Sequence, residues 1–303
     1  MKMLLTGSSG FIGRHLNSQG RDFRCVVREK VKQANKDVFI IDKFDSSTSW
    51  SGAFTDINTI IHLAGLAHSN SFIAQDYQSV NVDGTLHLAS EAAKSGVKRF
   101  VFVSSIGVNG SLTNGTLFTF NSNPSPHNPY TQSKYDAEIG LKKISQETGL
   151  EVVIVRPTLV YGANAPGNFG ILAKLVNKLP LLPFGLTANK RDFIAVHNLA
   201  DLLITCANHP NAGGHTFLAS DGDSVSIKEF TNAIGKGLGK TIVQLPVPVS
   251  LMNLVASLVG KSAMAGQLLG NLQVDSSNVQ DVLDWVPPYT MEQAMASLSE
   301  NKK

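Results

Sequence analysis

The stretch KMLLTGSSGFIG, residues 2–13, decides the fold of this chain. The short apolar run KMLLT is followed at once by three glycines, Gly7, Gly10 and Gly13, and by the start of a helical pattern. Glycines at these places let the backbone turn tightly and approach a pyrophosphate, whose charge is met by the N–H groups at the helix N-terminus. The stretch therefore predicts a first strand, a phosphate-binding turn and a helix.

Strand and helix patterns continue to alternate after this turn. The apolar runs are nearly continuous in Val, Ile, Leu and Phe, which is typical of strands covered on both faces. Two long helical patterns, 76–96 and 130–149, each end in a glycine. This alternation predicts an α/β fold with a Rossmann-type doubly wound parallel sheet. The strands expected after the first are 23–27, 38–42, 59–64, 99–105 and 151–157.

The regular alternation ends at about residue 162, after which Pro, Gly and Asn become frequent. We expect the sheet-forming domain to occupy 1–162 and to be completed by about 191–220. Shorter helical patterns with a few strands fill the remainder. The sequence thus predicts a smaller, α-rich substrate-binding region over 163–190 and 221–303.

The longest apolar stretch, 251–270, resembles a membrane span in length. Lys261 and several Ser and Gly residues within it argue against a spanning helix. We interpret it as a packed helix broken at Gly260, with contact to a membrane surface as the alternative.

Composition limits the classes of function. Of 303 residues, 43% are hydrophobic and 16% charged, which indicates a folded protein with a large core. The net charge of +3 is small and scattered, so a nucleic-acid-binding surface is not expected. Cys25 and Cys206 lie in apolar surroundings and are expected to be buried reduced thiols. With no secretion signal at the N-terminus, we expect a cytoplasmic protein.

A second motif, NPYTQSKYDAE at 128–138, places Tyr130 and Lys134 one helical turn apart. Positions i and i+4 share a helix face, so the phenol and the ammonium can face the same space. A free tyrosine has a pKa of about 10 and exchanges protons poorly at neutral pH. A nearby ammonium stabilises the phenolate, so we expect Lys134 to lower the pKa of Tyr130.

The end of the second strand bears on the kind of dinucleotide. An acidic residue there commonly holds the adenosine ribose, whereas a basic residue accommodates a 2′-phosphate. Here the strand ends in Arg28, followed by Glu29. NADP(H) is therefore favoured and NAD(H) remains possible, since Arg28 can instead stack on adenine or be solvated. Asp42 can reach the adenine edge or cap the following turn.

Taken together, these motifs resemble the extended short-chain dehydrogenase/reductase family, also called the NAD-dependent epimerase/dehydratase family. The resemblance rests on TGxxGxxG, Asn81 in VNVDGT, the Ser104–Ser105 pair in FVFVSSIGVNG, and YxxxK at 130–134. IIHLAGLAH, RPTLVYG and TFLASDG further resemble a nucleotide-sugar branch. That branch contains UDP-glucose 4-epimerase-like proteins and reductases of UDP-4-keto-6-deoxy-N-acetylhexosamines, which supply bacterial surface polysaccharides such as lipopolysaccharide.

The resemblance implies roles for individual residues. Ser105, Tyr130 and Lys134 would be catalytic, and Lys134 would also hold the nicotinamide ribose. Ser105 is preferred to Ser104 because it stands four residues before Asn109, which matches the family's spacing. The expected cofactor contacts are Gly7, Ser9, Gly10, Phe11, Ile12, Gly13, Arg28, Asp42, Leu63, Ala64, Gly65, Asn81, Tyr130, Lys134 and Pro157. The expected substrate contacts are His68, Ser105, Asn168, Phe169 and Arg191.

Some of these substrate contacts have alternatives. Arg191 is expected at the substrate diphosphate because its planar fork suits phosphate oxygens, with Lys190 as a helper or a solvated neighbour. His68 and Asn70 follow the fourth strand and face either the sugar or the backbone of their own loop. His62, inside that strand, is expected to be a hydrogen-bonded core residue. The eight histidines have no metal-ligand spacing, so no metal is expected.

Three functions follow from the resemblance. The favoured one is a 4-keto reductase that consumes NAD(P)H on a UDP-4-keto-6-deoxy-N-acetylhexosamine. The first alternative is a UDP-hexose 4-epimerase with retained cofactor, and the second is a non-catalytic NADP(H) sensor, against which the intact triad argues. A dehydratase is disfavoured because Ile106 and Gly107 replace its acidic pair. Relatives also imply a homodimer through 72–95 and 127–147.

Overall fold

The computed structural model describes residues 2–28, 37–67 and 71–300. Within them, seven parallel strands form the main sheet, in the order β10-β6-β5-β4-β1-β2-β3. The strand order reverses between β1 and β4, so a cleft opens there at the carboxyl ends of the strands. The strands are β1 Lys2–Thr6, β2 Phe23–Val27, β3 Val38–Ile40, β4 Ile57–His62, β5 Arg99–Val103, β6 Glu151–Pro157 and β10 Thr216–Ala219.

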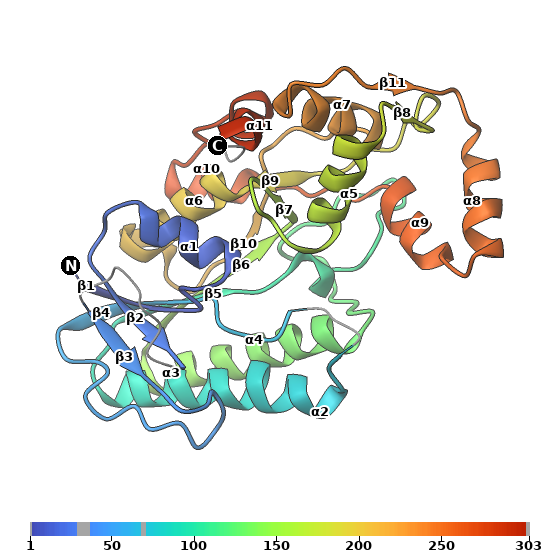
Figure 1. Cartoon of the computed structure of the whole chain (residues 1–303). Helices are drawn as coiled ribbons and strands as arrows, with labels where there is room; N and C mark the ends of the chain where they lie inside the picture. Colours follow the sequence, from blue (N-terminus) through green and yellow to red (C-terminus); the bar gives the residue numbers. More distant parts are fainter. Residues whose placement is uncertain (1, 29–36, 68–70, 301–303) are drawn as a thin grey trace.

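Helices cover both faces of this sheet, as the sequence predicts (Figure 1). On one face, Leu88 and Leu141 pack with strand residues such as Phe100. On the other, Leu16 and Leu203 do the same. The first face carries α2 Ala74–Tyr77, the π-helix η1 Gln78–Gly84, α3 Thr85–Lys94 and α4 Pro129–Thr148. The second carries α1 Phe11–Ser18, α6 Val196–Asn208 and α10 Ser277–Leu283.

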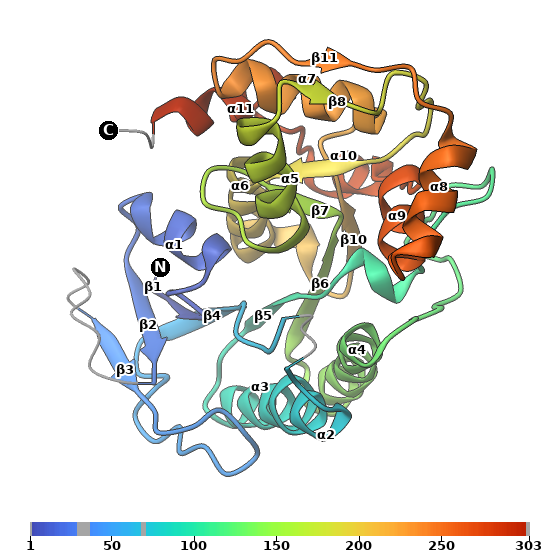
Figure 2. The same ribbon diagram turned by 45° about the vertical axis from the view of Figure 1, so that its right-hand side comes forward.

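The remaining elements form a smaller assembly above the carboxyl ends of the strands (Figure 2). A third apolar cluster, with Phe169, Phe193 and Phe230 near its centre, holds much of it together. Short strand pairs β7–β9 and β8–β11 complete it. Its elements are β7 Leu159–Tyr161, α5 Gly167–Lys178, β8 Leu181–Leu182, β9 Phe193–Ala195, α7 Ile227–Gly237, β11 Val243–Gln244, α8 Val249–Leu258, α9 Ser262–Leu269 and α11 Met291–Glu300, while the 3₁₀ turns η2 Ile106–Val108 and η3 Pro210–Ala212 belong to the sheet side.

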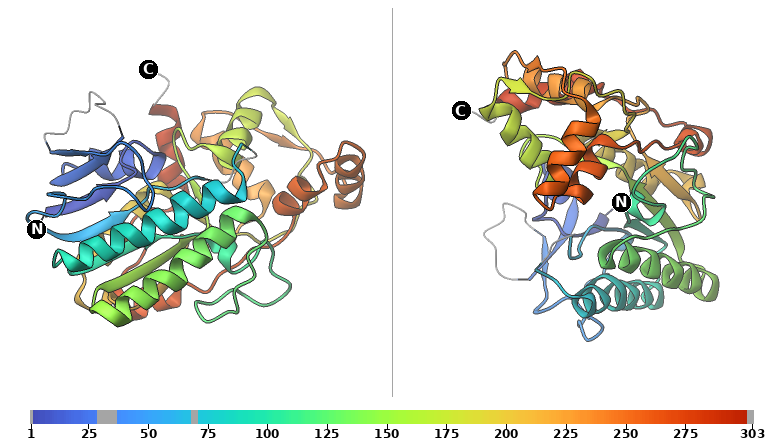
Figure 3. Two further views of the ribbon diagram at one scale, coloured as in Figure 1. Left: turned by 90° about the horizontal axis from the view of Figure 1, so that it is seen from below. Right: turned by 90° about the vertical axis from the view of Figure 1, so that its right-hand side faces the viewer.

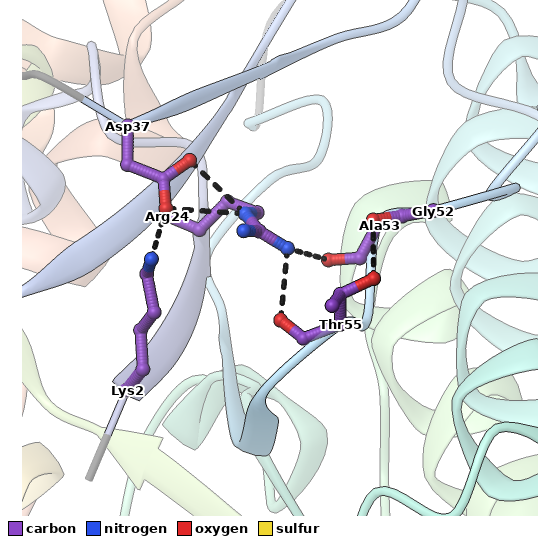
Figure 4. A network of polar contacts seen from close by, with 6 residues as sticks. All are labelled: Lys2, Arg24, Asp37, Gly52, Ala53 and Thr55. Atoms are coloured by element: carbon purple, nitrogen blue, oxygen red, sulfur yellow. Dashed lines mark hydrogen bonds and ion pairs between the residues drawn. The ribbon is translucent and has the colours of Figure 1, made fainter.

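The β3 edge of the sheet is fixed by one arginine (Figure 4). Arg24, on β2, bonds Asp37 through Nε at 3.0 Å and reaches the carbonyl oxygens of Ala53 and Thr55 through Nη1 at 3.0 and 3.1 Å. Lys2 holds the same carboxylate at 2.5 Å. Four segments that are distant in sequence are therefore tied together at the amino ends of β1 and β2, away from the cleft at their carboxyl ends.

The structure corrects one expectation about the 251–270 stretch. Gly260, with φ +69°, separates α8 from α9, so the predicted break is confirmed. The predicted packing holds only in part: α8 contains no buried residue, but Met252, Leu268 and Leu269 pack partly buried against the third apolar cluster. No helix within the described residues combines the length and hydropathy needed to cross a bilayer. Cys25 and Cys206 are free and buried, as expected.

Candidate active site

The glycine turn after β1 has no room for side chains. Gly7 has φ +69°, and a Cβ there would lie 2.8 Å from the backbone nitrogen of Ala64. A Cβ on Gly13 would collide with the carbonyl oxygen of Gly7, to which the N–H of Gly10 donates at 2.9 Å. The N-terminus of α1 is thereby held close against β1 and β4. This close, side-chain-free approach fits a pyrophosphate at the N–H groups of the turn.

Two buried polar side chains, Thr6 and His62, stabilise the segment that packs against the turn. Thr6 Oγ1 accepts the N–H groups of Leu63 and Ala64, each at 3.1 Å, and contacts His62 Nδ1 at 2.7 Å. His62 Nε2 contacts Thr85 Oγ1 at 2.9 Å. Burial holds the pKa of His62 well below its usual value, so the ring is neutral. The prediction that His62 is a hydrogen-bonded core residue is confirmed.

Two adjoining cavities run along the carboxyl ends of the strands. The first, of about 680 Å³, is lined by Ser9, Arg28 and Asp42. The second, of about 770 Å³, lies toward α4 and α9. Both contain Gly7, Gly10, Leu63, Gly65 and Leu66 in their walls, so they form one continuous groove. Of the residues expected from the sequence, the second cavity also brings together Phe11, Ile12, Gly13, Ser105, Tyr130, Lys134, Pro157, Asn168 and Arg191.

Tyr130 is delivered to this groove by the start of α4. Asn128 caps the helix by accepting the N–H of Thr131 at 2.9 Å, and Pro129 occupies the first helical position. Ser105, which caps the turn after β5, forms a hydrogen bond with Tyr130. The predicted helix thus places its first turn against the end of the fifth strand.

The pKa of Tyr130 differs from the expectation. Burial raises it to about 12, and the hydrogen bond from Ser105 opposes this only in part. Lys134 contributes no lowering of this pKa. Its Nζ donates to the carbonyl oxygen of Val103 at 3.0 Å and lies 4.7 Å from the Phe102 ring centroid. Tyr130 is therefore a protonated phenol at neutral pH.

Lys134 is itself strongly buried, with 5% of its surface exposed. Burial lowers its pKa to about 8, while Glu138, one turn further along α4, raises it. The ammonium is therefore mostly charged at neutral pH but readily deprotonated in mild alkali.

This shift predicts a pH dependence of stability. Between about pH 8 and 10.5 the unfolded chain holds a proton on Lys134 that the folded chain releases, so stability should rise with pH across that window. The full effect is about 3 kcal/mol, since each pKa unit corresponds to about 1.4 kcal/mol. Urea unfolding of wild type and Lys134→Met across this window measures it. The variant should lack this rise, and equal slopes would contradict the shift.

A buried ion pair next to the triad escaped the sequence analysis. Glu138 and Arg156 are 1% and 4% exposed and lie 2.5 Å apart. Ser104 Oγ donates to Glu138 at 2.5 Å, and Arg156 donates to Asn109 at 2.9 Å. Ser104 is thus tied to this network, whereas Ser105 bonds Tyr130. The i, i+4 spacing from Lys134 could have indicated that Glu138 faces the same side of α4. Nothing in that spacing indicates its ion-pair partner, Arg156, which lies on β6.

Two expected contacts line neither cavity, and a third lies outside the described residues. Phe169 is 1% exposed and packs against Tyr161 and Phe230, so it is a core residue and lines neither cavity. Asn81 is 1% exposed. Its amide bonds both the N–H and the carbonyl oxygen of Leu66, at 2.7 and 3.1 Å, so it fixes the cavity wall from behind. His68, like Asn70, lies outside the described residues.

Arg191 does reach the second cavity. One of its nitrogens donates to the carbonyl oxygen of Gly270 at 3.0 Å, and burial lowers its pKa to about 10. His127, Gln267 and Met264 line the same cavity and were not anticipated. His127 directly precedes the NPYTQSK motif, which is the signal that was available. Gln267 and Met264 lie in the stretch that was expected to be packed.

Comparison with known proteins identifies the family. A model described as the NAD dependent epimerase/dehydratase family matches residues 3–219. The chain belongs to this family. A UDP-glucose 4-epimerase of Vibrio cholerae is 39% identical to this epimerase/dehydratase family member over 98% of the chain and 94% of its own length. An N-acetyl-alpha-D-glucosaminyl-diphospho-ditrans,octacis-undecaprenol 4-epimerase of Escherichia coli O157:H7 is 24% identical over 97% and 92%.

A solved structure shares the fold of this family member. The UDP-glucose 4-epimerase of Thermotoga maritima, determined with UDP-glucose, superimposes with a TM-score of 0.76 at 21% identity, covering 99% of this chain and 98% of its own. The family member is an enzyme of the nucleotide-sugar epimerase/dehydratase type, so the sensor alternative is set aside. The 4-keto reductase is not confirmed, and the epimerase alternative agrees with the relatives at least as well.

Proposed function

We propose that this protein is a UDP-hexose 4-epimerase that removes a hydride from C4 of a UDP-sugar and returns it to the opposite face. The convergence of Ser105, Tyr130 and Lys134 on the groove beside the glycine turn carries the proposal. The similarity to the Vibrio cholerae epimerase along nearly the full chain supports it. Ser105 and Tyr130 would both contact the C4 oxygen.

The triad divides the work in the following way. A bound nicotinamide cofactor supplies the hydride acceptor and donor. Tyr130 holds its phenol proton at rest, so it would release that proton to solvent before it accepts the proton of the C4 hydroxyl in the oxidation step. It would then return the accepted proton to the C4 oxygen as the ketone is reduced. Ser105 orients the same oxygen through its hydroxyl. Lys134 lines the same cavity and is proposed to hold the nicotinamide ribose.

The groove also supports a dinucleotide cofactor. Gly7 and Gly13 make a side-chain-free cradle for the pyrophosphate, and Arg28 and Asp42 lie at the far end, where adenosine would bind. Both are exposed in the wall of the first cavity. We infer that the enzyme uses NAD(H) or NADP(H), and the preference for NADP(H) rests on the cation of Arg28 near the expected 2′-phosphate.

Arg191 is proposed to bind the substrate diphosphate. The names of the two enzyme relatives both denote substrates with a sugar-diphosphate group, and Arg191 provides a cation in the wall of the second cavity. Asn168 lines the same cavity and is proposed to contact the UDP-sugar.

Arg191→Ala should raise KM for the UDP-sugar about 10- to 100-fold with a smaller effect on kcat, because a charge-assisted hydrogen bond is worth about 1.5–3 kcal/mol. Steady-state kinetics measures the split. Lys190→Ala, which removes the exposed neighbouring cation, is the matched control and should leave KM within about twofold. An unchanged KM in Arg191→Ala would remove this residue from the diphosphate site.

A 4-keto reductase of UDP-4-keto-6-deoxy-N-acetylhexosamine is the second candidate. Arg28 favours it, because an exchangeable NADPH suits net reduction. The two are separated by offering NADPH or NADH with the keto sugar, and UDP-glucose or UDP-N-acetylglucosamine alone, in parallel. C4 epimers without net cofactor change support the epimerase. Stoichiometric cofactor oxidation by the keto sugar, with no epimers, would instead establish the reductase.

We further propose that the division into a cofactor domain, 1–162 with 191–220, and a nucleotide-sugar-binding region, 163–190 with 221–303, is functional. A homodimer through 72–95 and 127–147 is also proposed. Helices α3 and α4 lie side by side on one surface (Figure 3), and Ile139 there is 51% exposed. The free thiols of the chain agree with a cytoplasmic location.

A further inference from the structure

Helix α8 turns an apolar stripe toward solvent. Its outward residues follow the spacing i, i+3, i+4, i+7, i+8, which in a surface helix normally faces the core. Met252 and Ala256 are only partly covered by the protein on the opposite side. The outward residues and their exposed fractions are Leu251 48%, Leu254 57%, Val255 52%, Leu258 78% and Val259 60%. This face is therefore left for an occupant outside the fold.

The charge of the same segment is one-sided. From residue 241 to residue 274 the sequence contains one charged residue, Lys261, and no carboxylate. Lys261 is exposed at the turn between α8 and α9. Lys190 is exposed beside the chain that leaves α9, where its backbone pairs with Leu272 and Asn271. The segment therefore carries one cation and no carboxylate, and a second exposed cation, Lys190, lies beside the chain that leaves α9.

The hairpin formed by α8 and α9 also borders the active-site groove. Met264, 51% exposed, and Leu268 on α9 line the second cavity. The hairpin projects at the far end of the molecule from the β3 edge of the sheet (Figures 1 and 2). The nearby β8–β11 ribbon adds Leu181 and Val243, which are 50% and 52% exposed. Exposed apolar residues therefore occur on α8, on the β8–β11 ribbon and, at Met264, in the wall of the second cavity.

We propose that the α8–α9 hairpin docks on an anionic lipid bilayer, with the apolar stripe of α8 among the acyl chains and Lys261 and Lys190 at the headgroups. An amphipathic helix with basic residues at its polar boundary binds such interfaces. Anionic headgroups complement a border that has cations and no carboxylate. Two copies of the chain docked through this face would instead bring the same cations near one another, which is unfavourable. Docking would place the mouth of the groove at the headgroup level.

Vesicle flotation of the full-length protein tests the proposal. Vesicles of phosphatidylglycerol with phosphatidylethanolamine should carry the wild type, and vesicles of phosphatidylcholine should carry much less. The double variant Leu254→Ser/Leu258→Ser should lower the partition coefficient at least about tenfold, since each leucine loses about 1.5 kcal/mol or more of transfer free energy. Val286→Ser, with a similar exposed fraction of 58% and outside both the hairpin and the proposed dimer surface, is the control and should bind as the wild type does.

The double variant should keep wild-type turnover of a freely dissolved UDP-sugar, which separates this proposal from the proposed function. Wild type that stays unbound with anionic vesicles would overturn the docking proposal. So would a double variant that floats as well as the wild type. Light scattering measures the oligomeric state of both proteins. If the double variant changed its oligomeric state and the wild type did not bind vesicles, the apolar face of α8 would be a contact with a second copy of the chain instead.

Discussion

Tyr130→Phe should lower kcat about 10²–10⁴-fold while leaving cofactor binding intact, because the phenol oxygen is the proposed proton donor and acceptor at C4. The substitution removes one oxygen and leaves the ring packing beside Tyr77 unchanged. The loss should appear equally in kcat and kcat/KM, as expected for an interaction made in the transition state.

Tyr135→Phe is the matched control for this prediction. It lies on the same helix, is also half-buried, and lines neither cavity. Its turnover should stay within about twofold of wild type. Cofactor titration by fluorescence completes the comparison. If Tyr130→Phe lost cofactor affinity but kept turnover, the proton-transfer role would be wrong.

Glu138→Gln should lower the free energy of unfolding by about 3–5 kcal/mol, because it leaves the Arg156 guanidinium buried without its counter-charge. Glutamine preserves the shape of the side chain and a partner for Ser104. The effect is therefore attributable to the lost charge. Urea unfolding midpoints at one protein concentration measure it.

Two further variants serve as controls for the Glu138→Gln prediction. Glu91→Gln breaks the exposed Lys94–Glu91 pair and should change stability by less than about 1 kcal/mol. Glu138→Gln/Arg156→Met removes the stranded cation and should be more stable than the single variant. A single variant as stable as wild type, or a double variant less stable than the single, would contradict the assignment of Glu138 and Arg156 as a coupled buried pair.

Local signals in the sequence predicted the parts of the site that depend on neighbouring residues. The turn glycines and the start of α4 depend on residues that lie within a few positions of one another, and both features are present in the structure. Local sequence could not show whether Phe169 lines a pocket or belongs to the core, because an aromatic residue after a turn is common in both places. Its packing against Phe230 in the structure shows that it is a core residue.

Other features depend on contacts across the fold. The Glu138–Arg156 pair joins α4 to β6, and sequence spacing alone gives no partner for either charge. Asn81 is predicted to contact the cofactor, and this stays a prediction; in the structure, the π-helix in which it lies directs its amide to Leu66. The α8 stripe has the spacing of a core-facing helix, and the pattern cannot say which side the protein occupies.

The most direct test of the central claim follows the hydrogen at C4. The purified protein is incubated in ordinary water with UDP-glucose deuterated at C4, and the products are resolved by epimer and weighed by mass spectrometry. We predict a C4 epimer that retains the deuterium, because the hydride taken from C4 would be returned to the same carbon without exchange with water. Loss of the deuterium to solvent in the epimer, or no epimer from any UDP-hexose offered, would contradict it.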